Sequence, residues 1–205
     1  MNTDRKTVHA GADLDQGERA RADIYRLLAA LLAGPPDQAL LDLLRALEPD
    51  TTAGTSMNST WRELRAAAEN TGPQGVGEEY FNLFIGLGRG ELVPYGSWYV
   101  HGLLMEKLLA SLRDELATLG FGRRDGVSEP EDHVAALCET MGMIICDSEL
   151  SLRQAAFFET YLDSWMGRFF VDVEEAETAV FYKTVGRLGQ QFLGVERQYF
   201  SLPAE

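Results

Sequence analysis

Residues 152–170, LRQAAFFETYLDSWMGRFF, form the stretch with the strongest helical pattern in the sequence. Its apolar side chains return every three or four residues, which is the spacing of one face of an α-helix. The members of this stripe are Ala155, Ala156, Phe158, Tyr161, Leu162, Trp165, Met166 and Phe169. Because so broad an apolar stripe must be covered by other helices, the stretch predicts a shared helical core.

The same periodicity continues on both sides of this stretch, interrupted by turn signals. Gly34-Pro35-Pro36 and Gly72-Pro73 each end a helical pattern, and Thr60-x-x-Glu63 has the form of a capping box. Ser128-Glu129-Pro130-Glu131 is a second start signal. The expected helices cover residues 24–33, 37–47, 60–71, 78–85, 97–119, 128–148, 152–170 and 172–191. No alternating strand pattern is present, so we predict an all-α, single-domain helical bundle of about eight helices.

Composition narrows the class of protein. The chain has 205 residues and a formal net charge of −14, which argues against a nucleic-acid binder and favours a cationic partner or simple solubility. No uncharged stretch is long enough for a membrane span, and the polar segment Met1–Arg19 lacks the features of a secretory signal. Cys138 and Cys146 are eight residues apart in one expected helix, too far to form a disulfide. These features predict a cytoplasmic protein with reduced thiols.

The expected domain organisation is simple. Residues 1–17 form a flexible N-terminal tail, and residues 18–205 form the helical domain. The glycine-bearing segment 120–128 is long enough to act as a hinge, which would allow two copies to exchange helices. The sequence therefore leaves both a monomer and a domain-exchanged dimer open.

Residues for catalysis or for metal binding are scarce. The histidines are His9, His101 and His133, and neither an HExxH motif nor a Glu-x-x-His pair occurs. Gly86-x-Gly88-x-Gly90 resembles part of a dinucleotide loop, but it follows a helix instead of a strand and lacks a phosphate-binding lysine. We therefore expect no metal, no cofactor and no catalytic residues.

Aromatic and acidic residues gather around this glycine-rich loop. Tyr80, Leu83 and Phe84 share one helical face before it. Pro94, Tyr95, Trp98 and Tyr99 follow it. Core packing would explain each of them singly, but together they predict a binding cleft beside the loop. Carboxylates stand nearby at Glu78, Glu79, Glu91, Glu129, Glu131 and Asp132, and helix capping is the alternative role for the last three.

Three blocks carry a family resemblance. They are Glu79-Tyr80-x-x-Leu83-Phe84-x-Gly86, Pro94-Tyr95-x-Ser97-x-Tyr99 and Glu129-Pro130-x-Asp132-His133. Together they resemble the signature blocks of the cytoplasmic chaperones that mature molybdenum-containing redox enzymes, the TorD/DmsD/NarJ type. The resemblance covers residues 20–195.

The resemblance implies an all-helical chaperone without catalytic activity. Such chaperones bind the twin-arginine leader of a molybdoenzyme catalytic subunit and delay its export until the molybdopterin cofactor is inserted. The resemblance assigns the peptide site to Tyr80, Leu83, Phe84, Pro94, Tyr95, Ser97, Asp132 and His133. An acidic rim for the leader arginines would come from Glu79, Glu91, Glu129 and Glu131.

Two other functions stay open at this point. One is a nucleotide-binding or nucleotide-hydrolysing protein that uses residues 86–90 and Asp132. The other is a helical adaptor without a peptide groove.

Overall fold

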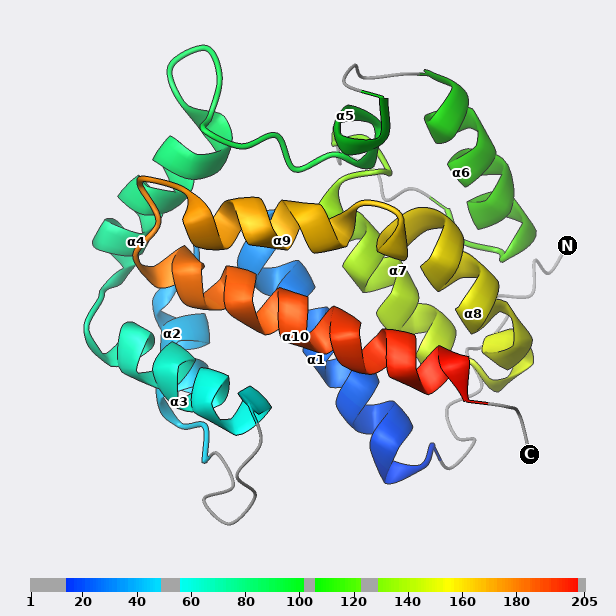
Figure 1. The fold of residues 1–205 in the computed structure, drawn as a ribbon, viewed down its shortest axis with the longest axis horizontal. Coiled ribbons are helices and arrows are strands. Elements are labelled where there is room, and N and C mark those ends of the chain that lie inside the picture. The colour runs from blue at the N-terminus through cyan, green and yellow to red at the C-terminus, as the bar shows by residue number, and fades with distance from the viewer. Residues whose placement is uncertain (1–13, 49–55, 102–105, 123–128, 203–205) are drawn as a thin grey trace, which may run out of the picture.

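Helices α1 (Gln16–Ala33) and α10 (Phe181–Ser201) bring the two ends of the chain into one core (Figure 1). The structure is a computed structural model that describes residues 14–48, 56–101, 106–122 and 129–202. These ranges contain ten α-helices, three short 3-10 or π segments and no strand, which confirms the predicted all-α fold. Helix α1 packs against α7 (Val134–Cys146), and α10 packs against α9 (Met166–Glu175).

The N-terminal half consists of α2 (Gln38–Arg45), α3 (Ser56–Glu69), α4 (Pro73–Tyr80) and the π-helical segment η1 (Phe81–Ile85). Two predicted starts were wrong. Helix α3 begins at Ser56, so Thr60 lies within the helix and is fully buried rather than acting as a cap. Helix α4 begins at Pro73 instead of residue 78, because the fixed φ of proline suits the first position of a helix.

In the middle of the chain one helix begins close to its predicted start and the next begins later than predicted. The expected helix 97–119 is described as α5 (Gly96–His101) and α6 (Glu106–Thr118), and residues 102–105 lie outside the described ranges. Helix α7 begins at Val134 rather than near Ser128, because its cap is His133, whose Nδ1 accepts a hydrogen bond from Ala135 N at 3.2 Å.

Two predicted flexible segments fall mostly outside the description. Residues 1–13 of the expected tail and residues 123–128 of the expected hinge are not described. Helix α1 itself begins within the expected tail, at Gln16, because Asp15 caps it by accepting a hydrogen bond from Glu18 N at 2.7 Å.

The stretch 152–170 is helical but not one helix. It runs through η2 (Ser148–Arg153, 3-10), α8 (Gln154–Phe157) and η3 (Phe158–Asp163, π) before α9 begins after a turn. At that turn Trp165 Nε1 donates to Tyr161 O at 2.8 Å. Six members of the predicted apolar stripe are nevertheless buried: Phe158, Tyr161, Leu162, Trp165, Met166 and Phe169. Ala155 is only half-buried and Ala156 is exposed, because the 3-10 and π segments shift the register of the helix.

Two carboxylates fix the turn between α9 and α10. Glu79 accepts hydrogen bonds from Val180 N (2.8 Å), Phe181 N (3.0 Å) and Tyr182 N (2.8 Å), which caps the start of α10. Glu91 accepts from Glu177 N at 2.6 Å and from Thr178 N at 3.2 Å. The last helix therefore begins at Phe181, so its predicted start near residue 172 was wrong, whereas the predicted helix through residue 191 and beyond is confirmed.

Glycines allow α9 and α10 to approach each other closely. A Cβ atom at Gly186 would lie 2.6 Å from Glu174 N and 2.7 Å from Phe170 O. A Cβ atom at Gly189 would lie 2.3 Å from the Phe170 ring. Since real Cβ contacts are longer than this, only glycine fits at both positions.

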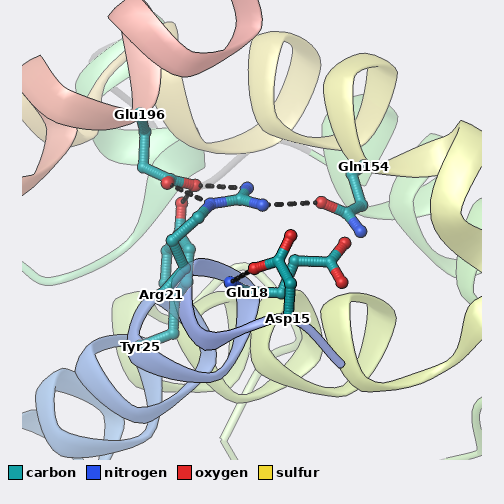
Figure 2. A network of polar contacts seen from close by, with 6 residues as sticks. All are labelled: Asp15, Glu18, Arg21, Tyr25, Gln154 and Glu196. Carbon is teal, nitrogen blue, oxygen red and sulfur yellow. Dashed lines mark hydrogen bonds and ion pairs between the residues drawn. The ribbon is translucent and has the colours of Figure 1, made fainter. Parts of the chain in front are cut away.

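A buried polar network joins both ends of the chain (Figure 2). Arg21 Nε donates to Glu196 Oε1 at 2.6 Å, and a second guanidinium nitrogen donates to Glu196 Oε2 at 2.9 Å. Tyr25 OH donates to Glu196 Oε2 at 2.9 Å, and Arg21 also donates to Gln154 Oε1 at 3.0 Å. All four side chains are buried, so the paired charges satisfy each other inside the core.

Candidate functional site

Two of the predicted blocks meet at the start of α7. Gly96 N donates to Asp132 O at 3.0 Å, and Val134 N donates to Pro94 O at 2.9 Å. The Asp132 carboxylate also accepts from Ser97 N at 2.8 Å, at the start of α5. The structure thus places the Pro94–Ser97 block directly against the Asp132-His133 block, although 35 residues separate Ser97 from Asp132.

Tyr95 and His133 form the inner part of this junction. Their rings are in edge-to-face contact, with centroids 5.1 Å apart, and Tyr95 OH donates to the carboxylate of Glu129. Burial and this hydrogen bond raise the pKa of Tyr95 above its usual value. Burial lowers the pKa of His133, more than the neighbouring carboxylates of Glu129 and Asp132 raise it. His133 is therefore a neutral imidazole, as its role as a hydrogen-bond acceptor requires.

A pocket of about 310 Å³ lies between α6, α7 and the segment that leads into the junction. Its apolar wall consists of Leu116 on α6, Phe121 after the end of α6, and Met143 on α7. Met143 is 37% exposed, although the other side of α7 is buried against α1. The pocket therefore offers accessible apolar surface beside the two predicted blocks.

Acidic side chains dominate the charge of the pocket. Among the residues that the structure describes, Glu129, Glu131 and Glu139 line it together with one cation, Arg113. Arg113 Nε lies 3.0 Å from Glu131 Oε2, and another nitrogen of the same guanidinium lies 2.9 Å from that oxygen. Carboxylates beside apolar surface suit a ligand that carries both a guanidinium and an apolar side chain.

The first predicted block does not reach the pocket. Tyr80 is 6% exposed and donates from its hydroxyl to Leu32 O at 3.2 Å, and Leu83 is fully buried. Burial raises the pKa of Tyr80 to about 12. Phe84 is half-buried and packs against the rings of Tyr80 and Tyr182. In this arrangement Tyr80 and Leu83 stabilise the core and present no surface to a ligand.

Only two of the four carboxylates predicted to form an acidic rim lie at the pocket. Glu129 and Glu131 line the pocket. Glu79 and Glu91 instead hold the turn between α9 and α10 through the hydrogen bonds described above, and neither lines the pocket.

The glycine-rich loop closes against the helix that precedes it. Gly86 N donates to Phe81 O at 2.7 Å, and Leu92 N donates to Leu83 O at 2.8 Å. A Cβ atom at Gly90 would lie 2.5 Å from the backbone of Phe84, so the loop needs glycine for close packing. Gly86 serves the turn itself, because its φ is +60°. These contacts give the glycines a structural role at the end of η1.

Sequence reasoning predicted Glu129 and Glu131 as site residues but missed the other eight described residues that line the pocket: Arg113, Leu116, Phe121, Gly122, Ala136, Glu139, Thr140 and Met143. One signal was available. Glu139 is the only charged residue in α7, and Ala136, Thr140 and Met143 share its helical face. A single carboxylate in an otherwise uncharged helix marks the face that opens to solvent.

The described parts of the chain contain neither a candidate metal site nor a candidate membrane-spanning helix. Within residues 14–48, 56–101, 106–122 and 129–202, His, Cys, Asp and Glu form no group of three or more that could hold a metal ion. In the same ranges, no helix has both the length and the apolar composition needed to cross a bilayer.

Sequence comparisons show similarity to one protein family and to chaperones named TorD. Residues 51–171, more than half of the chain, match the family model described as nitrate reductase delta subunit. The chaperone protein TorD of Vibrio atlanticus is 25% identical over 203 residues, covering 88% of this chain and 94% of that protein. TorD of Shewanella loihica is 24% identical over 204 residues, covering 90% and 94%.

A solved structure is similar over nearly the whole chain. It is the crystal structure of a protein from Archaeoglobus fulgidus that is assigned as a redox enzyme maturation protein. The TM-score is 0.56 at 20% identity, with 93% of this chain and 99% of that chain covered. At this identity the similarity shows a common fold.

Proposed function

The chain belongs to the nitrate reductase delta subunit family, and from that premise we propose that it is a cytoplasmic chaperone for the maturation of a molybdenum-containing oxidoreductase. We infer further that it binds the twin-arginine leader of the catalytic subunit and assists cofactor insertion before export. Its TorD relatives are chaperones, in agreement with the expectation that this chain is not an enzyme.

The observation that carries this proposal is the pocket between α6 and α7. A twin-arginine leader presents two adjacent guanidinium groups followed by an apolar stretch. The carboxylates of Glu129, Glu131 and Glu139 suit the guanidinium groups, and Phe121 and Met143 suit the apolar residues. The junction of Tyr95, Asp132 and His133 is linked to this site, because the hydroxyl of Tyr95 donates a hydrogen bond to the carboxylate of Glu129.

Apolar contact should supply most of the affinity. Covering roughly 300 Å² of apolar surface yields about 7 kcal/mol before the costs of ordering the peptide are subtracted. An exposed ion pair adds only about 0.2–1 kcal/mol. The acidic pocket therefore selects cationic ligands and accelerates their encounter, and both effects should weaken with added salt.

Isothermal titration calorimetry with a synthetic leader tests the proposal. The peptide is the leader of a molybdoenzyme encoded beside the gene, and the matched control is the same peptide with both arginines replaced by glutamine. We expect the native leader to bind and the glutamine peptide to bind about tenfold more weakly, a difference of about 1.4 kcal/mol. If no such leader binds, the proposal is rejected.

A further inference from the structure

A second pocket, of about 500 Å³, lies where η3 and α9 meet α10, and it shares no described residue with the pocket between α6 and α7. Its described lining holds two guanidinium groups, Arg168 and Arg197, and one carboxylate, Asp163. The whole chain has 32 acidic and 18 basic side chains, so a local excess of positive charge is opposite to the charge of the protein. This α9–α10 pocket therefore favours a ligand that carries negative charge.

Both arginines keep donor groups for such a ligand. Within the described parts of the chain, Arg168 on α9 has neither a hydrogen bond nor an ion pair. Arg197 on α10 donates from Nε to Asp163 Oδ1 at 2.5 Å, and no described residue accepts from its two terminal nitrogens. Since a guanidinium has five N–H donors in a planar fork, either side chain can bind a carboxylate through two parallel hydrogen bonds.

Gly167 allows Arg197 to lie against the backbone of α9. A Cβ atom at Gly167 would lie 2.8 Å from a terminal nitrogen of Arg197, which is closer than real Cβ contacts. The guanidinium therefore packs against the glycine while Asp163 holds its Nε. A side chain that is already ordered in this way loses less conformational entropy when it binds a ligand.

Gln190 adds a hydrogen-bond acceptor to the same pocket. Its Nε2 donates to Phe170 O at 3.2 Å and to Glu174 Oε2 at 2.7 Å. Because both partners are acceptors, they fix which end of the amide is the NH₂ group. The carbonyl oxygen Oε1 has no donor among the described residues, and it can accept from the N–H group of a peptide. An inorganic anion such as sulfate has no N–H group to offer.

We propose that the α9–α10 pocket binds an acidic peptide segment of a partner protein. An Asp or Glu side chain of the segment pairs with Arg168 and Arg197, and a neighbouring backbone N–H donates to Gln190 Oε1. Val171 lines the pocket and is 36% exposed, so it can contact an apolar residue beside the acidic one. This site goes beyond the proposed leader pocket, because it consists of different residues and selects ligands of the opposite charge.

NMR titration of the full chain with a synthetic acidic peptide tests the proposal. The probe is acetyl-Val-Glu-Leu-Glu-Val amide, and the matched control has both glutamates replaced by glutamine. The reporter is the indole N–H of Trp165, which lines the pocket and donates to Tyr161 O at 2.8 Å. The acidic peptide should shift this signal to saturation. The glutamine peptide should bind about tenfold more weakly, because it keeps the apolar residues and the backbone N–H groups but loses both charges.

Arg168→Glu and Lys183→Glu form the matched pair of variants. Each reverses the charge of an exposed side chain that has no ion pair in the described parts of the chain, so neither leaves a carboxylate without its partner. Lys183 lies on α10 but does not line the pocket. Arg168→Glu should weaken binding of the acidic peptide about tenfold, whereas Lys183→Glu should stay within about twofold of wild type. Thermal melts confirm that both variants are folded.

Three results would overturn the proposal, and none of them depends on binding of the twin-arginine leader. One is the lack of a saturable shift when the acidic peptide is added to wild type. Another is an equal loss of affinity in Arg168→Glu and Lys183→Glu, which would show an effect of net charge alone. The third is an equal shift of the Trp165 signal by inorganic phosphate at the same concentration, which would show a site for simple anions.

Discussion

His133 is held at the start of α7 as a neutral imidazole. Its Nδ1 accepts a hydrogen bond from Ala135 N, its ring contacts Tyr95, and burial lowers its pKa below the usual value of 6.5. Protonation of Nδ1 would remove the acceptor and place a charge in a buried position. The histidine that the sequence marks as a ligand-binding candidate therefore also has a direct part in stability.

This role predicts a pH dependence of unfolding. Between the folded pKa of His133 and 6.5, the unfolded chain binds more protons, so the stabilisation is fully present above pH 6.5 and is lost as the pH falls through the folded pKa. His133→Asn keeps a cap acceptor but does not titrate. Its unfolding free energy should fall less steeply below pH 6.5, by at most about 1.4 kcal/mol per pH unit.

Urea denaturation of wild type and His133→Asn at pH 7.5, 6.5 and 5.5 provides the check. Subtracting the two curves removes the contributions of His9 and His101, which both proteins share. Parallel curves would mean that His133 does not titrate in this way.

At the scale of helices, contact between α9 and α10 depends on the absence of side chains at two positions of α10. A Cβ atom at Gly186 would approach the backbone of Glu174 and Phe170 to 2.6–2.7 Å, and backbone cannot rotate away as a side chain can. Gly194 lies on the same helix with nothing within 4 Å of its Cβ position. Gly186 and Gly194 therefore lie on the same helix, but only Gly186 is closely packed against a neighbouring helix.

Alanine at these positions should have opposite effects. Gly186→Ala should lower the unfolding free energy by about 1–3 kcal/mol through overpacking. Gly194→Ala should leave it unchanged or raise it by up to about 1 kcal/mol, because alanine favours a helix more than glycine does. Guanidinium denaturation measures both, and equal effects would show that close packing at Gly186 does not matter.

Helix existence follows from the sequence more reliably than helix boundaries do. The apolar period of residues 152–170 correctly predicted a buried helical face, but nothing in it predicted the π segment or the turn at Trp165. The start of α10 depends on Glu79, about 100 residues away, which no local pattern can reveal. Boundaries fixed by distant carboxylates are therefore beyond single-sequence reasoning.

At the scale of the whole molecule, contacts between distant segments determine both the core and the site. The pair of Arg21 and Glu196 joins residues 175 positions apart, and no local pattern indicates that these charges are buried together (Figure 2). The junction of Tyr95 with His133 joins two blocks that the family resemblance selected. The resemblance thus found residues beside the pocket, whereas Leu116, Phe121 and Met143 became visible only once α6 and α7 were placed.

The pocket between α6 and α7 is the site that we propose for a cationic leader. The most direct test of this proposal is calorimetric titration of the twin-arginine leader into Met143→Arg and Val195→Arg. Both variants place one added positive charge at an exposed apolar position, the first in the pocket and the second on α10, and thermal melts confirm that each is folded.

We predict that Met143→Arg weakens leader binding at least tenfold, about 1.4 kcal/mol, while Val195→Arg stays within about twofold of wild type. Wild-type affinity in a folded Met143→Arg, or an equal loss in both variants, would contradict the claim.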